Sequence, residues 1–368
     1  MARRRTHRRG TGTASQQRPS GPRLPSELQR GFADVGLELA RQKLIARRWR
    51  EAYEFAEPSQ TGNPDAAHAV MAEASARQAR RYALKGDFQQ AQVWAQRASE
   101  LGPGDARYHE EARRIRRAAE AVLEDFGTSL FPDTVGPGRG HWWDFDLLSR
   151  VRGGEDGVAT VPAPLIMQET SRSAIEDVYA VGTYQPWHVA GPTPLFTRYI
   201  RELKPAGTTL PYAAMLLRQG LVLETDWLED IDVLVPMATS LRAFETRGFE
   251  LTEELAGELG LRLCLPVVDA FEVNPDAEST HYLSGYQQRA KSLAESVRLK
   301  AHRSRDLRDA GALLVLDDVV TYGSTFEACG MKLRECYPHL RVYGAALAYT
   351  ETPQRRAIAE AERVPVSP

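Results

Sequence analysis

The stretch 313-LLVLDDVVTYGST-325 decides the fold of the second half of the chain. Four apolar residues lead into Asp317 and Asp318, and a short turn rich in hydroxyl groups follows. An apolar run of this length predicts a parallel β-strand that is buried on both faces. Residues 326–336 then have a helical pattern. In an open α/β sheet ligands bind at the carboxyl ends of the strands, so we expect the two aspartates to lie at a binding site.

The turn between this strand and this helix is suited to binding phosphate. Its residues are Thr321, Tyr322, Gly323, Ser324 and Thr325. Backbone N–H groups at a helix N-terminus, together with hydroxyl groups and one glycine, form a cradle for an anion. Two carboxylates beside such a cradle can accept hydrogen bonds from ribose hydroxyls, which suits a sugar phosphate. Two simpler interpretations stay open: the acids can bind Mg²⁺, or Ser324 or Thr325 can be an ordinary helix N-cap.

The whole string resembles the phosphoribosyl-pyrophosphate (PRPP) binding motif of type I phosphoribosyltransferases, an apolar strand followed by D-D-φ-φ-T-T-G-x-T. Only Tyr322 departs from it, because a second threonine is usual at that place. The resemblance implies that Asp317 and Asp318 are catalytic residues that hold the ribose. It also implies that residues 321–325 bind the 5′-phosphate.

Short apolar segments alternate with amphipathic ones from about Ile175 onward, which predicts an α/β domain with a parallel sheet. The predicted strands are 178–184, 233–236, 263–266, 313–316 and 341–349. The predicted helices are 195–203, 210–217, 250–259, 287–300 and 325–336.

Three further blocks in this region resemble the competence-associated ComF-type phosphoribosyltransferases, from Tyr179 to the end of the chain. The first, 195-LFTRYIRELK-204, is similar to that family's amphipathic "IxxLK" helix. The second comprises 232-DVLVPM-237, Arg242 and 247-RGF-249, and resembles "D-x-φ-φ-P-V-P-L…R…R-G-F-N-Q". The third, 289-RAKSL-293, resembles "R-x-x-N-V". The order and spacing of the blocks agree with the family, which implies a Rossmann-like type I phosphoribosyltransferase fold.

The resemblance implies attack of a nitrogen nucleophile on the ribose of PRPP, with pyrophosphate leaving. Arg242 and Arg247 carry the charge and donors that phosphate oxygens need, and they fall in the expected pyrophosphate loop. Arg289 lies on a segment that could close over the site. Mg²⁺ is the implied cofactor, which Asp317 and Asp318 would contact indirectly, through ribose hydroxyls or water.

Besides Tyr322, the chain departs from the family at three places. It lacks the family's N-terminal zinc element with four cysteines, and helical sequence occupies that place. Glu250 and Leu251 replace the "N-Q" pair, and Ser292 replaces the asparagine of "R-x-x-N-V". These changes fall in the pyrophosphate and acceptor regions, so the sequence predicts PRPP binding more firmly than turnover.

The first half of the chain has a helical pattern without a convincing strand. Within it, residues 72–105 resemble one tetratricopeptide repeat, in which Gly86 opens the turn and Pro103 ends the second helix. A degenerate copy around Trp49 precedes it, and a helix over 105–123 would cap the array. A plain α-helical bundle is the alternative. The predicted organisation is a disordered basic tail (1–23), a small all-α tetratricopeptide-like domain (24–125), a turn-rich linker (126–172) and the phosphoribosyltransferase domain (173–368).

Composition bears on the partners and the cellular location that we expect for this protein. The hydrophobic fraction is 42%, the charged fraction is 26% and the net charge is −2, so no global charge draws the chain to nucleic acid. No segment reaches the ~20 apolar residues that span a bilayer, and the N-terminus does not resemble a signal peptide. Cys264, Cys329 and Cys336 are predicted to be buried thiols in a reducing compartment, which indicates the cytoplasm.

Two functions follow from the sequence. The first is a phosphoribosyltransferase that acts on PRPP and a nitrogenous acceptor, which the sequence does not identify. The second is a non-catalytic PRPP or nucleotide sensor whose helical region binds a protein partner, with a link to DNA uptake or processing implied by the competence resemblance. A tetratricopeptide scaffold with a vestigial α/β domain is a third alternative. The basic tail suits nucleic acid or an acidic partner, or serves only as a solubilising arm.

Overall fold

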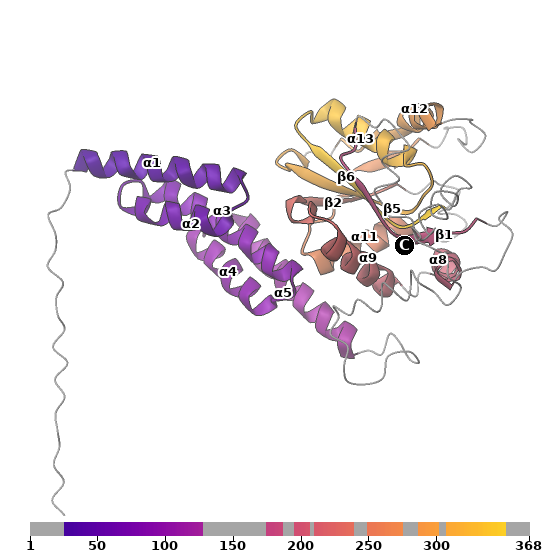
Figure 1. The fold of residues 1–368 in the computed structure, drawn as a ribbon, viewed down its shortest axis with the longest axis horizontal. Coiled ribbons are helices and arrows are strands. Elements are labelled where there is room, and N and C mark those ends of the chain that lie inside the picture. Colours follow the sequence, from indigo (N-terminus) through magenta and orange to yellow (C-terminus); the bar gives the residue numbers. More distant parts are fainter. Residues whose placement is uncertain are drawn as a thin grey trace, which may run out of the picture. The chain divides into compact units, whose positions relative to one another are not determined.

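Figure 1 shows the chain as a computed structural model that describes residues 26–127, 174–186, 195–206, 210–238, 249–274, 286–301 and 307–350. The predicted tail (1–23) and nearly all of the predicted linker (126–172) lie outside the described residues. The chain divides into two compact units, Met1–Ala74 and Ser75–Pro368. None of the described helices is long and apolar enough to cross a membrane.

The first 102 described residues, 26–127, contain helices only. These are α1 (Ser26–Ile45), α2 (Trp49–Ala56), the 3₁₀ helix η1 (Glu57–Thr61), α3 (Pro64–Leu84), α4 (Phe88–Leu101) and α5 (Ala106–Gly127). The predicted helix–turn–helix over 72–105 is confirmed. Gly86 has φ 77°, which a glycine adopts without strain, and the Asp87 carboxylate caps α4 by accepting a hydrogen bond from the Gln90 N–H at 3.0 Å. The assignment of this helix–turn–helix to the tetratricopeptide family stays a prediction.

The remaining described elements form an α/β fold. They are β1 (Val178–Tyr184), α8 (Leu195–Ala206), α9 (Leu210–Glu224), η2 (Leu228–Asp230), β2 (Val233–Pro236), α11 (Leu251–Leu263), β3 (Phe271–Val273), α12 (Tyr286–Ser296), β4 (Val297–Leu299), β5 (Ala312–Val320), α13 (Ser324–Cys336) and β6 (Arg341–Thr350). Four strands make a parallel sheet in the order β1-β6-β5-β2, and β3 and β4 form a separate antiparallel pair. The predicted parallel sheet with flanking helices is confirmed.

Helices or the small β3–β4 pair cover both faces of the sheet (Figure 1). Leu314 and Leu316 of β5 pack into a core cluster with α8, α9 and α11. Leu313 and Val315, which alternate with them, pack into a second cluster with α13 and the β3–β4 pair. Both faces of β5 are therefore buried, as its continuous apolar run predicts.

One predicted strand is absent, and another is longer than predicted. Residues 263–266 do not form a strand, because α11 continues to Leu263 and Cys264 ends it in the left-handed conformation, with φ 57°. Only an isolated bridge between Leu234 and Val267 follows. Short apolar runs do not distinguish a strand from a helix end by periodicity. β5 is longer than predicted, since it runs through Asp317 and Asp318 to Val320.

Two smaller predictions also need correction. The predicted helix 287–300 ends at Ser296, and its last residues form β4 instead. Of the three cysteines, Cys264 and Cys329 are buried as predicted, but Cys336 is exposed, because it ends α13 on the side away from the core.

Helices α3 to α5 contact the α/β elements inside the second unit, from Ser75 onward. The Arg218 guanidinium of α9, only 3% exposed, donates to the backbone oxygens of Leu84 and Arg262, both at 3.0 Å. These carbonyls end α3 and α11, where orphan acceptors need a donor. Leu84 itself packs into the core cluster of α8, α9 and α11.

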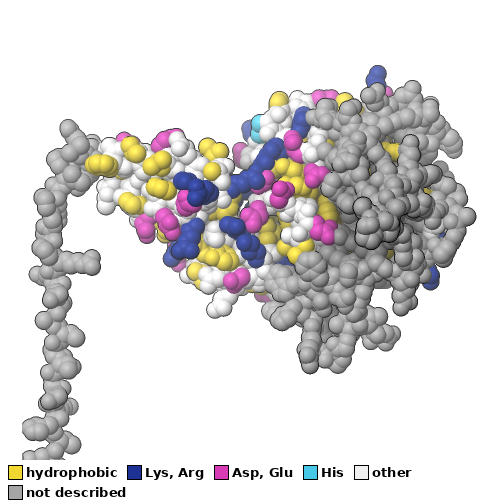
Figure 2. Space-filling view, in the orientation of Figure 1, with side chains coloured by type: hydrophobic (Ala, Val, Ile, Leu, Met, Phe, Trp, Pro, Cys, Tyr) yellow, Lys and Arg dark blue, Asp and Glu magenta, His cyan; other side chains and the backbone are white. Residues whose placement is uncertain are grey.

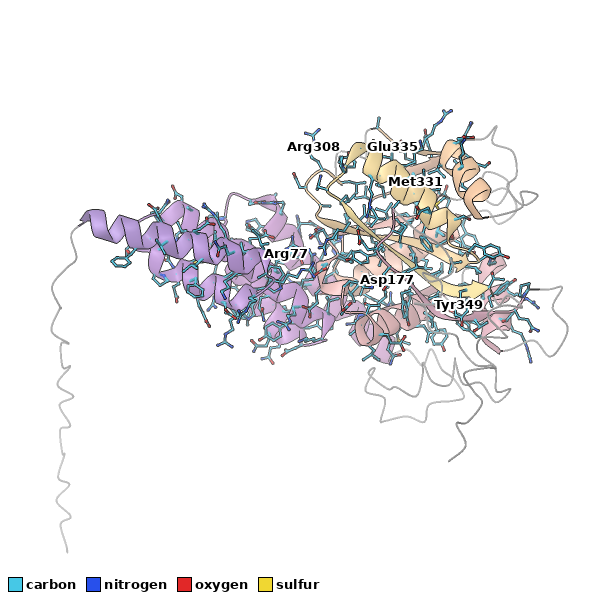
Figure 3. The ribbon with its side chains drawn as sticks, turned by 45° about the horizontal axis from the view of Figure 1, so that its top comes forward. Arg77, Asp177, Arg308, Met331, Glu335 and Tyr349 are labelled. Carbon is cyan, nitrogen blue, oxygen red and sulfur yellow. The ribbon has the colours of Figure 1, made fainter. Side chains whose placement is uncertain are left out.

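An ion-pair network forms a second contact between these helices and the sheet. Arg77 (labelled in Figure 3) and Arg80 of α3 pair with Asp232, which directly precedes β2. Arg80 also pairs with the buried Glu111 of α5 at 3.1 Å, and Arg114 pairs with Glu111 at 2.7 Å. On the face drawn in Figure 2, basic and acidic side chains of the described residues are interspersed.

Candidate functional site

The candidate site lies at the carboxyl ends of the parallel strands. Because all four strands of the sheet are parallel, their carboxyl ends meet at one edge, where α/β proteins bind ligands. β5 is an interior strand, paired with β2 on one side and β6 on the other. Asp317 and Asp318 lie in its last part, and the Met237 N–H donates to the Leu316 carbonyl at 2.8 Å just beside them. The segment that follows β2 therefore starts next to the aspartates.

Asp317 and Asp318 direct their carboxylates toward different elements. Asp318 forms an ion pair with Lys204 of α8, with Nζ 2.9 Å from Oδ2. Asp317 lies close enough to Cys329 of α13 for its charge to act on that thiol: burial raises the pKa of Cys329, and the charge of Asp317 raises it further. α8 and α13 cover opposite faces of the sheet, and the two carboxyl groups nevertheless interact with each other.

The Asp317 carboxyl has an unusual ionisation. Burial and then the charge of Asp318 raise the pKa of Asp317 to about 7, although the Asp318 N–H donates to Asp317 Oδ1 at 2.8 Å and Lys204 lies nearby. Burial alone would lower the pKa of Lys204, but the charge and hydrogen bond of Asp318 outweigh it and raise that pKa. The site therefore contains one carboxyl that changes its protonation near neutral pH. Such groups are often functional.

Lys204 is a site residue that sequence reasoning missed. The sequence places it in the helix block 195–204 but gives it no contact with the aspartates. In the structure its Nζ also lies 5.9 Å from the centroid of the Tyr184 ring, at the end of β1. The lysine could have been noticed only as the charged end of an amphipathic helix, because its partner is far away in the sequence.

The turn after β5 is short and contains a glycine in the left-handed conformation. Only Thr321, Tyr322 and Gly323 separate β5 from α13. Gly323 is buried with φ 74° and ψ 11°, in the left-handed region that favours glycine, and it occupies the N-cap position. The alternative of Ser324 or Thr325 as N-cap is therefore wrong. Both instead lie in the first turn of α13, where they are partly exposed.

Hydroxyl groups fix the start of this turn to the neighbouring strand. Thr321 Oγ1 lies 2.8 Å from Thr350 Oγ1 at the end of β6. One residue earlier, the Tyr349 hydroxyl (residue labelled in Figure 3) accepts a hydrogen bond from Thr183 Oγ1 of β1 at 3.2 Å. Sequence reasoning did not identify Thr350 or Thr183, because their contacts depend on strand order.

The structure does not describe the side chains of the three predicted arginines. Arg242 and Arg247 lie outside them, in the segment that begins beside Leu316 after β2. Arg289 lies in α12, but its side chain is not among those that the structure describes. Their predicted roles stay predictions.

Two carboxylates at this edge fit a Mg²⁺ ion that keeps water ligands and arrives with phosphates. Among the described residues, no group of three or more His, Cys, Asp or Glu side chains could hold a metal ion by itself. A metal ion that depended on the protein alone would therefore find too few ligands in the described part of the site. A metal ion bound together with a diphosphate would need only one or two carboxylates.

Neither the models of known protein families nor the curated proteins include a match to this chain.

Proposed function

We propose that this protein binds PRPP with Mg²⁺ and transfers its phosphoribosyl group to a nitrogen nucleophile, with release of pyrophosphate. One observation carries the proposal. An adjacent pair of aspartates lies at the carboxyl end of an interior parallel strand, and a three-residue turn with a left-handed glycine joins that strand to a helix N-terminus. This arrangement supplies acceptors for a sugar and donors for a phosphate within one short segment.

Each part of the segment has a task in this proposal. The carboxylates of Asp317 and Asp318 accept hydrogen bonds from the ribose hydroxyls. The N–H groups at the start of α13 and the hydroxyls of Ser324 and Thr325 hold the 5′-phosphate. A side chain on Gly323 would require a strained backbone at φ 74°, so glycine keeps this turn tight.

The negative charge of the aspartates also acts on the reaction. Positive charge develops on the ribose ring when the bond to pyrophosphate breaks, and fixed carboxylates stabilise that charge. Because Asp317 titrates near pH 7, more of this negative charge is available above neutral pH. Mg²⁺, when bound, would neutralise the leaving pyrophosphate. Arg242, Arg247 and Arg289 are proposed to hold the pyrophosphate. Most of the rate gain then comes from positioning and electrostatics.

Calorimetry with PRPP and Mg²⁺, followed by pyrophosphate release with a panel of nucleobases and amines, tests this proposal. The wild-type chain is expected to bind PRPP only when Mg²⁺ is present. The double variant Asp317→Asn/Asp318→Asn should lose both binding and release. The matched control is Asp226→Asn, an exposed aspartate before β2 at the opposite edge of the sheet, and it should behave as the wild type does. Absence of PRPP binding by the wild-type chain would refute the proposal.

Binding without turnover is the second candidate, as expected of a sensor. It is favoured by Tyr322, a large and partly exposed side chain inside the proposed phosphate turn. Tight PRPP binding with no pyrophosphate release from any acceptor would select it. The helical region remains the proposed site for a protein partner in that case. The cytoplasm remains the proposed location, which fits three cysteines that are all free thiols.

A further inference from the structure

Three elements meet around Lys204. It belongs to the last turn of α8, Asp318 belongs to β5, and Tyr184 ends β1. The Lys204 side chain is 36% exposed and that of Asp318 is 19% exposed, so their ion pair is partly shielded from water. A pair of this kind between separate elements fixes a carboxylate more firmly than a pair on an open surface does.

Lys204 is itself held by the end of β1. Its ammonium lies 5.9 Å from the centroid of the Tyr184 ring, and the Arg201 guanidinium lies 5.8 Å from the same centroid. Arg201 also donates to the Gln185 carbonyl at 2.8 Å, and the Gln185 N–H donates to Thr197 Oγ1 at 3.0 Å. α8 is thus attached to β1 along two of its turns. These contacts hold α8, the helix that carries Lys204, against the end of β1.

The aspartate pair needs such a cation. Two adjacent carboxylates repel each other, and each can lower the repulsion by taking a proton or by turning away. Of the described charged and titratable groups, Lys204 on α8 pairs with Asp318, and Cys329 on α13 lies close to Asp317. Of these, only Lys204 has a described ion pair with an aspartate of the site.

We propose that Lys204 is a positioning residue of this site: Tyr184 holds Lys204, and Lys204 holds the Asp318 carboxylate where it accepts hydrogen bonds from the ligand. This inference deepens the proposed function and rests on it. Lys204 then acts through Asp318 rather than by its own contact with PRPP. The ammonium has three donors on a flexible stem, so it can keep Asp318 in place while the ligand enters.

A double-mutant cycle measured with PRPP and Mg²⁺ tests whether Lys204 acts through Asp318. Lys204→Met keeps the length of the side chain and removes its charge, and it should weaken PRPP binding by roughly tenfold. Lys204→Arg should restore most of the affinity. In the Asp318→Asn background, Lys204→Met should change the affinity by less than about twofold. Equal effects of Lys204→Met in both backgrounds would overturn the inference, because they would show that Lys204 acts on the ligand directly.

The matched control is Lys43→Met. Lys43 of α1 pairs with Glu51 of α2 at 2.9 Å, and both side chains are partly exposed. Its removal should leave PRPP affinity unchanged. A loss equal to that of Lys204→Met would show that any such pair matters only for the stability of the fold.

A second measurement needs no ligand and so separates this inference from the proposed function. Acetylation of each lysine by a limiting reagent, followed by mass spectrometry, reports how firmly each amine is held. Lys204 should react slowly in the wild-type protein and roughly threefold faster or more in Asp318→Asn. Tyr184→Leu should also speed its reaction, and Tyr184→Phe, which keeps the ring, should not. If Lys204 reacts equally fast in Asp318→Asn and in the wild type, the proposed positioning role of Lys204 is refuted even if PRPP binds. If Lys204 reacts slowly in the wild type but the protein does not bind PRPP, only the proposed function is refuted.

Discussion

Asp317 combines two properties that seldom occur together in a structural residue: it is buried enough to resist ionisation, and it lies beside a second carboxylate. Burial and Asp318 raise its pKa to about 7. Its charge is thus costly to the folded protein and useful only if a ligand compensates for it. Functional carboxyls commonly show this conflict between stability and activity.

This conflict predicts how the stability of the ligand-free protein depends on pH. An unfolded aspartate has a pKa near 3.8, so between about pH 4 and pH 7 the folded protein holds a proton that the unfolded chain has lost. The free energy of unfolding contributed by Asp317 therefore falls as pH rises through this window and is level above it. Asp317→Asn should be more stable than wild type by about 1–2 kcal/mol at pH 8 and equal to it near pH 4. Urea unfolding at several pH values measures this, and a difference that does not change with pH would contradict it.

The pKa of Glu111 is shifted in the opposite direction from that of Asp317. Burial would raise its pKa, but Arg80 and Arg114 outweigh burial and hold the pKa of Glu111 below its ordinary value. The stability that Glu111 contributes is fully present above about pH 4.5, the ordinary pKa of a glutamate. It is lost as the pH falls through the lower pKa that Glu111 has in the folded protein. Glu111→Gln should therefore cost about 2–3 kcal/mol at pH 7, and the cost should shrink in acid. The control Glu110→Gln, next to it on α5 but more exposed, should cost less than about 0.5 kcal/mol at both pH values.

The packing of one element on another depends on close approach at specific positions. α9 lies against β1 at Gly220, where an added Cβ would be 1.7 Å from the buried Tyr179 hydroxyl. In α11, Gly257 is exposed, and an added Cβ would meet nothing within 4 Å. A side chain therefore has no room at Gly220 and open space at Gly257, and only the structure distinguishes the two positions.

Alanine substitutions should reveal this difference. Gly220→Ala should destabilise the protein by about 2 kcal/mol or more, because neither α9 nor the buried Tyr179 ring can move freely. Gly257→Ala should stabilise it by about 0.5–1 kcal/mol, since alanine is the better helix former. Unfolding midpoints in urea measure both. A loss of stability in Gly257→Ala, or none in Gly220→Ala, would contradict the packing described for these two helices.

The elements also show what sequence alone can predict. β1 and β2 have the predicted bounds, because each is an apolar run between polar or turn residues. The failed strand at 263–266 is an apolar run too, but Cys264 turns the chain there. In the site, Asp317 and Asp318 were predictable since they are adjacent in one motif. Lys204 was not, because its contact depends on how α8 crosses the end of the sheet.

Within the second unit, the structure joins helices and sheet more closely than the sequence indicates. The sequence changes composition near residue 173, but the compact unit begins at Ser75, inside α3. Cys264 of the α/β part is buried in a cluster with Ala79, Ala83 and Ile115 of the helices.

Arg218 gives the sharpest test of this connection. Arg218→Met leaves the carbonyls of Leu84 and Arg262 without a buried donor, and it should cost about 3 kcal/mol. The control Arg113→Met removes a 61% exposed arginine and should change stability by less than about 0.5 kcal/mol. Chemical denaturation followed by circular dichroism measures both. Equal effects of the two substitutions would show that the buried guanidinium does not connect α3 to α9 and α11.

The carbonyl contacts of Arg218 bear on how the protein can be dissected. A fragment cut where the composition changes would keep a buried arginine but discard the end of α3 that accepts its hydrogen bonds. It would also expose Cys264 to oxidants and leave Asp232 without Arg77 and Arg80. A fragment that begins at Pro64, the start of α3, keeps all of these partners. Binding measurements on the shorter fragment would therefore report the damage of the cut as much as the properties of the site.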